Sequence, residues 1–462
     1  MKRIFAVLMT LAVATALHAT DLSISGSIDM ALIPFQLVWN DEANEDEYEF
    51  VMGSGIGRNA SGQGPRARLD MRVSNEELGI GMRTRLQVRT DGFGVEDFLQ
   101  AWWTPFSWLR FDAGRFHDDR LRGRFNDLDE RMHAYTVRMH NADAIFSRFN
   151  THWTGQAGVM VGLTPPAPAL ENLWVGALLY GLVPFSAASG TGAIFDSTPD
   201  MITDNTDVWQ RMQVAIAYEI PGVGLFRTQF FGARPYVDIR VITDERPQIP
   251  YTYRVVTFGI TAPRIEAAFA FTGIEGLVID VGGKVPLAFR DWSRPRSNIF
   301  DREDEADITD PLYLIYRRGH IWQAPYQVSI GASYRIGILE LAGRADASFG
   351  GSLKGHYSER HFAPELNLHF WPTFHFDAFR LTLNVGYEWI GETVDRHGNI
   401  VGIGEPRALV GGHRLGFGVS AQRNFMANAF VRAGVAYRLA GTVNGVRERA
   451  VLTIPLHMEF MF

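Results

Sequence analysis

The chain has 462 residues, a formal net charge of −7 at pH 7 and no cysteine. The acidic balance argues against nucleic acid as a partner, because phosphate backbones are recognised by clustered basic side chains. Without disulfides, a chain of this length needs another source of stability if it is exported. The mean hydropathy of −0.05 is typical of soluble proteins, but also of barrels in which half of each strand faces water.

The first residues have the pattern of a secretory signal peptide. Two basic residues precede an apolar run from Ile4 to Leu17, and the small residue Ala19 marks the expected cleavage site. Cleavage after Ala16 is the alternative. The apolar run is too short to be a spanning helix, so we expect a signal peptide at 1–19 and one exported domain at 20–462, with no transmembrane helix.

The exported part is filled with segments in which apolar residues recur at every second position. This period is typical of strands with one apolar face. Most segments are about ten residues long, which is the length that a tilted strand needs to cross a bilayer. The predicted strands include Asp21–Ile33, Arg66–Ser74, Glu77–Thr90, Val208–Tyr218, Leu225–Phe231, Val328–Ile336, Leu339–Phe349, Phe379–Trp389, His413–Ala421 and Ala429–Tyr437.

Short turns and long polar loops connect these segments. Long loops such as Ser186–Asp207 and Arg290–Gly319 alternate with short turns such as Pro221–Gly224, as in outer-membrane barrels. The alternation is ambiguous at Met132–Leu182 and Arg234–Arg264. We therefore predict an all-β, transmembrane, antiparallel up-and-down barrel with an even number of strands, about 16–22 and best estimated as 18.

The C-terminal segment combines strand periodicity with a terminal aromatic residue. Its apolar positions are Leu452, Ile454, Leu456, Met458, Phe460 and Phe462. A soluble protein would expose a sticky edge here, whereas a closed barrel in lipid has no edge. The segment resembles the C-terminal signal of bacterial outer-membrane barrels, which implies that Phe460 and Phe462 are read by the barrel assembly machinery. Pro455 removes one ladder donor, so we expect a local bulge or an unpaired site there.

One stretch resembles a hairpin of bacterial porins. It runs from Ala101 through Thr104-Pro105 to Phe116 and contains an aromatic–proline turn followed by a Leu-x-Phe-x-x-Gly-Arg strand. Together with the following Asp118–Gly123, it is similar to porin-type proteins of spirochaetes such as treponemes. The resemblance implies an outer-membrane location, contact with outer-membrane lipid and passage of small solutes, and leaves an oligomer open.

If the apolar positions face lipid, the residues between them face the lumen. This places many arginines inside, where either a water-filled conducting wall or a salt-bridged filler would accommodate them. Asp112, Gln229, Glu340 and Asp346 share this inward parity. The candidate pore-lining residues are Arg66, Arg68, Arg72, Arg83, Arg85, Arg89, Arg110, Arg227, Arg344, Arg380, Glu388, Arg414, Arg432 and Arg438.

Two other sequence features bear on function. Aromatic residues near strand ends, including Trp102, Trp103 and Trp174, are typical of interfacial girdles. The acidic stretches Asp41–Glu49 and Asp301–Asp307 are expected to be solvated loops. Because no catalytic, phosphate-binding or metal-ligand motif is present, we expect no enzyme, no cofactor and no metal.

The sequence therefore indicates a porin-like outer-membrane channel for passive diffusion of small hydrophilic solutes. Two alternatives remain at this stage. A transporter for hydrophobic substrates would need an N-terminal plug, for which the early start of the strand pattern at Asp21 leaves no room. A surface-exposed binding protein or adhesin would act through the long loops.

The role of the terminal Phe462 as an assembly signal can be tested directly. We expect Phe462→Asp to reduce insertion of the barrel into the outer membrane sharply, because the charge disrupts recognition and adds a polar group at the interface. The amount of heat-modifiable folded barrel in membrane fractions measures the effect. A mutant with normal levels of folded barrel would contradict the proposed signal.

Overall fold

The structure is a computed structural model that describes residues 21–38, 47–53, 66–89, 92–118, 120–121, 149–150, 158–180, 212–232, 234–244, 251–287, 314–323, 325–354, 359–361, 363–392, 394–395, 411–426, 429–443 and 446–461. Strands account for most of this part of the chain, with one short 3-10 helix, η2 (Pro168–Leu170). Within these ranges, no helix is both long and apolar enough to cross a membrane. The signal peptide predicted at 1–19 and Phe462 lie outside the described residues.

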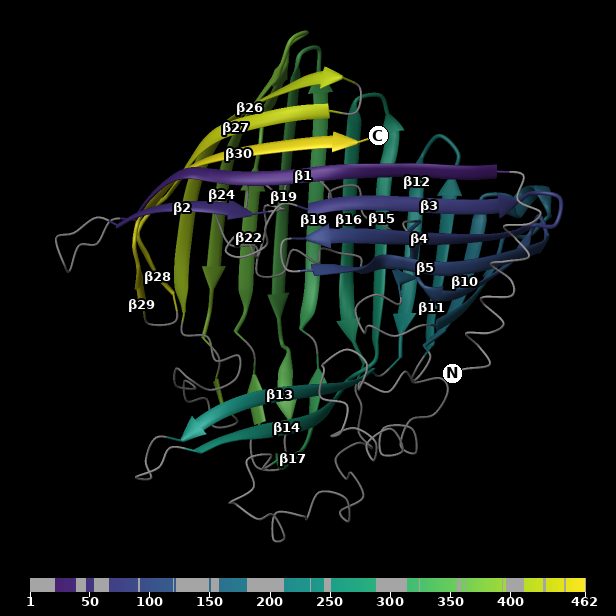
Figure 1. The fold of residues 1–462 in the computed structure, drawn as a ribbon, viewed down its shortest axis with the longest axis horizontal. Helices are drawn as coiled ribbons and strands as arrows, with labels where there is room; N and C mark the ends of the chain where they lie inside the picture. Colours follow the sequence, from purple (N-terminus) through teal and green to yellow (C-terminus); the bar gives the residue numbers. More distant parts are fainter. Residues whose placement is uncertain are drawn as a thin grey trace.

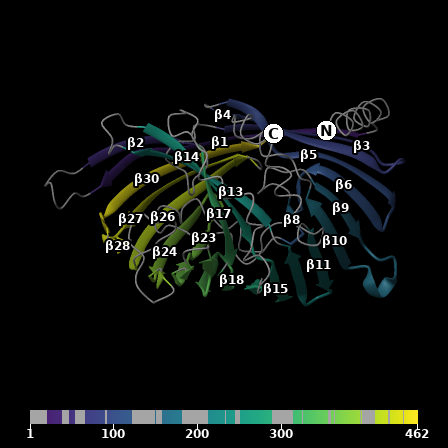
Figure 2. The same ribbon diagram turned by 90° about the horizontal axis from the view of Figure 1, so that it is seen from below.

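The architecture is a closed antiparallel barrel (Figures 1 and 2). Its wall has 18 strands, here called staves, because β22 and β23 together form one of them. The last stave before the ring closes is β30, which pairs with β1. In order round the ring the staves are β1 (Asp21–Val38), β3 (Arg66–Asn75), β4 (Ile80–Arg89), β5 (Gly92–Phe106), β6 (Leu109–Arg115), β9 (Gly158–Leu163), β10 (Leu173–Tyr180), β11 (Met212–Ile220), β12 (Gly224–Phe231), β15 (Arg264–Ile274), β16 (Leu277–Pro286), β18 (Tyr326–Ile336), β19 (Leu339–Phe349), β22 (Glu365–Phe370) with β23 (Thr373–His375), β24 (Arg380–Ile390), β26 (Gly412–Met426), β27 (Ala429–Arg438) and β30 (Val451–Met461).

The two ends of the chain close the ring. β30 pairs with β1 from Ser27↔Met461 to Val38↔Val451, and Figure 1 shows β1 lying between β30 and β3. The β1 register shifts between Leu32 and Phe35, opposite Pro455, and the ladder between β27 and β30 is interrupted at the same level. The expected irregularity at Pro455 is therefore confirmed, and its cause is the missing proline N–H.

The barrel is polar inside and apolar outside. On the last stave, Ile454 and Phe460 are exposed on the outer face, whereas Thr453 and His457 are buried on the inner face. The same alternation holds on β19, where Leu341 is exposed and Arg344 is buried. Because successive side chains of a strand point to opposite faces, a period-two sequence separates the two environments wherever the register is regular.

Short turns gather at one end of the barrel. Gly222 in the turn between β11 and β12 has φ of 71°, and Gly276 between β15 and β16 has φ of 76°. Glycine adopts this left-handed backbone without steric penalty, which allows the chain to reverse within a few residues. The termini of the described chain, at β1 and β30, lie at the same end, as the even stave number requires.

A second sheet lies at the opposite end of the barrel. Its six strands are β13 (Arg234–Asp244), β14 (Tyr251–Thr261), β17 (Leu314–Gln323), β20 (Ser352–Lys354), β21 (Glu359–His361) and β25 (Val394–Asp395). In Figure 1, β13, β14 and β17 lie below the lower ends of the staves. Smaller pieces pair locally: β2 (Glu47–Gly53) with β1, β7 (His117–Asp118) with β8 (Phe149–Asn150), and β28 (Gly441–Val443) with β29 (Val446–Glu448).

The predicted closed antiparallel barrel and the best estimate of 18 staves are confirmed. The structure also explains why the pattern was ambiguous at Arg234–Arg264. β13 and β14 have strand periodicity, yet they pair with each other and with β17 instead of entering the ring. Their alternation is a property of local hairpin pairing, which the sequence does not distinguish from pairing within a barrel wall.

The separation of turns and loops predicts a labelling pattern. We expect tags inserted within 186–207 or 290–319 to be reachable from outside intact cells, and tags at Glu76 or Gly222 to be unreachable, because short turns face the periplasm in such barrels. Antibody binding to intact and permeabilised cells measures this. The reverse pattern would contradict the orientation, and equal labelling would contradict the barrel.

Candidate functional site

The inner face of the barrel holds every candidate residue predicted to line a lumen. The register of each ladder puts them on the same face as the buried polar side chains. Only the backbone register is described for Arg66 and Arg89. The residues so placed are Arg66, Arg68, Arg72, Arg83, Arg85, Arg89, Arg110, Arg227, Arg344, Arg380, Glu388, Arg414, Arg432 and Arg438.

The first group of arginines lies on β3 and β4, around one carboxylate. Arg85 stands directly opposite Asp70, and Arg72 stands opposite Arg83. Asp70 accepts hydrogen bonds from Arg83, with Nη2 2.6 Å from Oδ2, and from Arg85, with Nη2 2.8 Å from Oδ2. One carboxylate thus orients two guanidinium groups through charge-assisted bonds.

Trp102 on β5 continues this group toward β6. Its ring packs over Gly81, where any Cβ would collide with the indole. The guanidinium carbons of Arg72 and Arg110 lie 5.0 and 5.1 Å from the ring centroid, a cation–π geometry. The ring therefore joins arginines from β3 and β6 on one continuous surface.

A second carboxylate holds Arg110. Asp112 on β6 accepts bonds from Arg110 Nε at 3.0 Å and Nη2 at 2.7 Å, and a further bond from Gln100 Nε2 at 2.7 Å. We call the inward-facing Arg68, Asp70, Arg72, Arg83, Arg85, Trp102, Arg110 and Asp112 the basic sector. Its described charged side chains are five arginines and two aspartates, so its net charge is positive.

The arginines of the basic sector retain access to solvent from inside the barrel. The side chains of Arg83, Arg85 and Arg110 are 31%, 20% and 35% exposed. By contrast, Arg227 on β12 is 0% exposed and forms an ion pair with the buried Asp280 of β16. The inner wall therefore contains two kinds of arginine, distinguished by their exposure.

A buried polar network surrounds the Arg227–Asp280 pair. Gln213 donates to Gln229 at 2.7 Å, and Gln229 donates to Glu266 at 2.6 Å. Glu266 also contacts Arg264 at 2.8 Å and the ammonium of Lys284 at 3.8 Å. Four adjacent staves, β11, β12, β15 and β16, are thus linked on their inner face by side-chain bonds.

A similar network occupies the inner face of β19 to β27. Arg414 bonds Glu388 at 2.7 Å with both side chains buried, and Arg344 pairs with Asp346 at 2.7 Å. Arg380 and Arg432 approach Gln422 from the strands on either side of it. We call this network, together with the one around Arg227–Asp280, the paired sector.

The inward arginines fall into two groups that differ in exposure. Arg72 is exposed and Arg83, Arg85 and Arg110 are partly exposed, whereas Arg227, Arg344, Arg414 and Arg432 are buried and bonded to a carboxylate or an amide. A single class of pore-lining arginines does not describe the inner face. Both sectors have acceptors beside their arginines, and they differ in how far the guanidinium groups are exposed.

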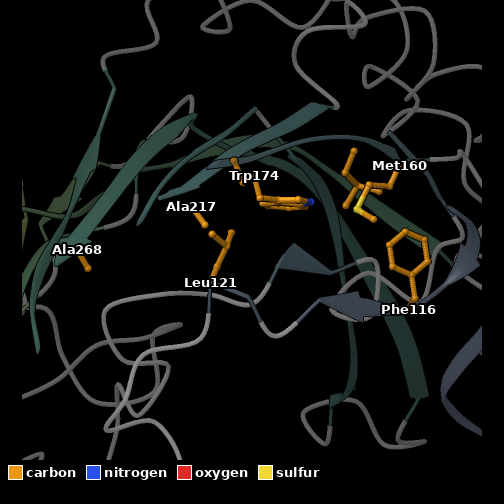
Figure 3. Packing of buried hydrophobic residues seen from close by; sticks show 8 residues of the cluster. Phe116, Leu121, Met160, Trp174, Ala217 and Ala268 are labelled. Atoms are coloured by element: carbon orange, nitrogen blue, oxygen red, sulfur yellow. The ribbon is translucent and has the colours of Figure 1, made fainter. Parts of the chain in front are cut away.

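Part of the connection after β6 also lies inside the barrel. Figure 3 shows Phe116 and Leu121 facing Met160, Trp174 and Ala217 of the inner wall. Phe116 and Leu121 are almost fully buried. This apolar contact anchors the chain that leaves β6 against β9, β10 and β11, on the side of the lumen next to the basic sector.

The expected aromatic girdle is only partly correct. Trp103 is 49% exposed on the outer face and stacks on Phe111, as a girdle residue would. Trp102, Trp174 and Trp371 are buried on the inner face instead. Neighbouring residues of a strand must point to opposite sides, so Trp102 and Trp103 were never able to share one girdle.

The inner face offers few ligands for a metal ion. Across the ranges that the structure describes, no three His, Asp or Glu side chains are grouped so that they would hold one. The carboxylates of both sectors are instead engaged by arginine and lysine.

These features define the class of protein. A closed antiparallel barrel with no unpaired edge, an apolar outer face and a polar inner face is a transmembrane β-barrel of the outer-membrane type. In lipid, only helices and closed barrels satisfy all their backbone hydrogen bonds. The outer membrane is therefore the location of this barrel.

Comparisons with known proteins give structural similarity only. No protein-family model and no curated protein sequence matches the chain. It is similar in structure to a loop-deletion mutant of OmpT, an outer membrane protein of Vibrio cholerae (11% identity, TM-score 0.42, covering 96% of this chain and 99% of that one).

Two further solved structures are similar over the same extent. An anion-selective porin from Comamonas acidovorans has 9% identity and a TM-score of 0.42, covering 96% of this chain and 99% of that one. A mutant of Rh. blastica porin has 11% identity and a TM-score of 0.39, covering 96% and 100%. At these values the function has to be argued from the residues of this chain.

The buried Arg227–Asp280 pair is open to a stability test. We expect Asp280→Asn to destabilise the barrel by about 3–5 kcal/mol, because it leaves a buried guanidinium without its counter-charge. The midpoint of thermal unfolding in detergent measures the change. Asp377→Asn, an exposed turn residue, is the matched control and should leave the midpoint unchanged.

A double variant separates the charge effect from a packing effect. Arg227→Met with Asp280→Leu removes both charges and keeps apolar volume, so its midpoint should return toward the parent value. If Asp280→Asn has the same unfolding midpoint as the parent protein, the Arg227–Asp280 pair does not contribute to stability as its burial indicates.

Proposed function

We propose that the protein is a porin-like channel through which small hydrophilic solutes diffuse passively across the outer membrane. The observation that carries the proposal is the basic sector, a set of partly exposed guanidinium groups on the inner face of a closed 18-stave barrel. Charged groups that keep access to solvent inside a barrel are the natural lining of a water-filled path.

The mechanism combines exclusion by size with local charge. The arginines Arg227, Arg344, Arg414 and Arg432 of the paired sector are buried, and Phe116 and Leu121 make an apolar inward contact. Solutes would therefore pass along the basic sector, where the positive field raises the local concentration of anions. A net charge of −7 for the whole chain does not oppose this, because the lumen responds to the charges that line it.

The proposed partners follow from the same architecture. Outer-membrane lipid covers the apolar outer face, and the assembly machinery is proposed to recognise the last strand through Phe460 and Phe462. Phe460 is exposed on the outer face, where such a receptor would reach it. The proposal assigns no catalytic step, and the inward Asp70 and Asp280 are each held by arginine.

The basic sector predicts anion preference. We expect the double variant Arg83→Gln with Arg85→Gln to shift the reversal potential under a salt gradient toward cations. Two positive charges are lost, and Asp70 is left without the groups that neutralise it. The shift should shrink at high salt, where screening shortens to about 3 Å near 1 M. Planar-bilayer recordings measure it.

Arg423→Gln is the matched control, because Arg423 is exposed on β26 at a position that faces away from the lumen. It should leave selectivity unchanged. A purified, folded protein that forms no conducting pore would contradict the channel. That result would favour a loop-mediated binding protein or a carrier of hydrophobic substrates. If the double variant conducts with unchanged ion selectivity, Arg83 and Arg85 act as salt-bridged residues like those of the paired sector and do not set the selectivity.

A further inference from the structure

The basic sector contains the indole ring of Trp102, which contacts two of its guanidinium groups. Trp102 is 8% exposed, and the guanidinium carbons of Arg72 and Arg110 lie 5.0 and 5.1 Å from its centroid. Arg72 comes from β3 and Arg110 from β6, so the three residues span four adjacent staves. Both guanidinium groups therefore contact the same ring, on the same part of the inner face.

Each of the two guanidinium groups is held by a different partner. Asp112 binds Arg110 through Nε and one terminal nitrogen, at 3.0 and 2.7 Å. A bidentate bond of this kind uses one edge of the planar fork, and a guanidinium has a second edge with further N–H donors. Arg72 is exposed and contacts the ring, which restricts a long side chain that would otherwise move freely in solvent.

We propose that Arg72, Trp102 and Arg110 form a binding site for small solutes that carry two oxyanion groups, such as dicarboxylates or diphosphates. This inference rests on the proposed channel function and deepens it. A diffuse positive field concentrates every anion, whereas two ordered forks favour planar or tetrahedral oxyanions that accept paired hydrogen bonds. Solutes would then occupy a saturable site during their passage.

The position of the site supports a role in permeation. Arg72 stands opposite Arg83, which Asp70 orients, so a third guanidinium lies next to the pair on the same wall. The neighbouring inward residue Ser23 on β1 is exposed, and solvent therefore reaches this part of the inner face. A ligand would meet basic groups on three strands without displacing the paired sector.

The test measures block of the chloride current through single channels of the folded, purified protein. Succinate and pyrophosphate are added at constant ionic strength, with propionate as the single-charge comparison. We expect saturable reduction of the current by the two dianion probes and none by propionate at matched concentration. The succinate and pyrophosphate arms separate carboxylate from phosphate recognition, and saturable block by one or both supports the site.

A charge-neutral substitution isolates the role of the ring. Trp102→Leu changes no charge, yet it removes the cation–π contacts, so we expect the half-blocking concentration to rise about 5–10-fold. Trp103→Leu, the adjacent residue on the outer face, should leave it unchanged. Trp102→Phe keeps a ring and should give an intermediate value. Heat modifiability confirms that each variant is folded.

The outcomes separate this inference from the channel itself. Absence of any conductance in the parent protein overturns the proposed function. Conductance without saturable block by either dianion overturns only the binding site. Block that is equal in the parent and in folded Trp102→Leu also overturns it, because the arginines would then act through their charge alone.

Discussion

The whole structure depends on closing the ring between β1 and β30. Lipid offers no hydrogen-bond partner, so each strand edge must be paired, and β1 meets this demand by bonding β3 on one side and β30 on the other. Closure also separates two environments, since every stave must present one face outward. The register irregularity at Pro455 shows that the ring remains closed although the pairing of β30 with both neighbouring strands is interrupted at one level.

The arginines of the inner face are held by their hydrogen-bond and ion-pair partners in two ways. Around β12 to β16 and β19 to β27, carboxylates and amides on neighbouring strands enclose them, as for Arg227 with Asp280 and Arg414 with Glu388. On β3 and β4, Asp70 orients two guanidinium groups that remain partly exposed. One side of the barrel is thereby braced by buried polar bonds, while the other side presents basic groups to the lumen.

Much of this arrangement could be predicted from period-two patterns, because the alternation of a strand is local. Leu339–Phe349 was predicted with the bounds that β19 has, and the inward parity of Arg344 followed from Leu341. Trp102 was missed as an inner residue. The register of β5 shifts opposite Thr84 and Leu86, so the inward and outward positions cannot be counted along the whole strand. Because Trp102 and Trp103 are adjacent, the sequence also does not show which of the two points inward.

The sequence by itself determined the class of the fold and the inward register of the candidate arginines, since both depend on the short-range geometry of a pleated strand. The tertiary structure alone decided which arginines are enclosed and which remain accessible. That choice depends on partners distant along the chain: Arg227 and Asp280 are separated by 53 residues, and Trp102 receives Arg72 only because β3, β4 and β5 lie side by side. Such pairings arise from closure of the ring, and no local pattern encodes them.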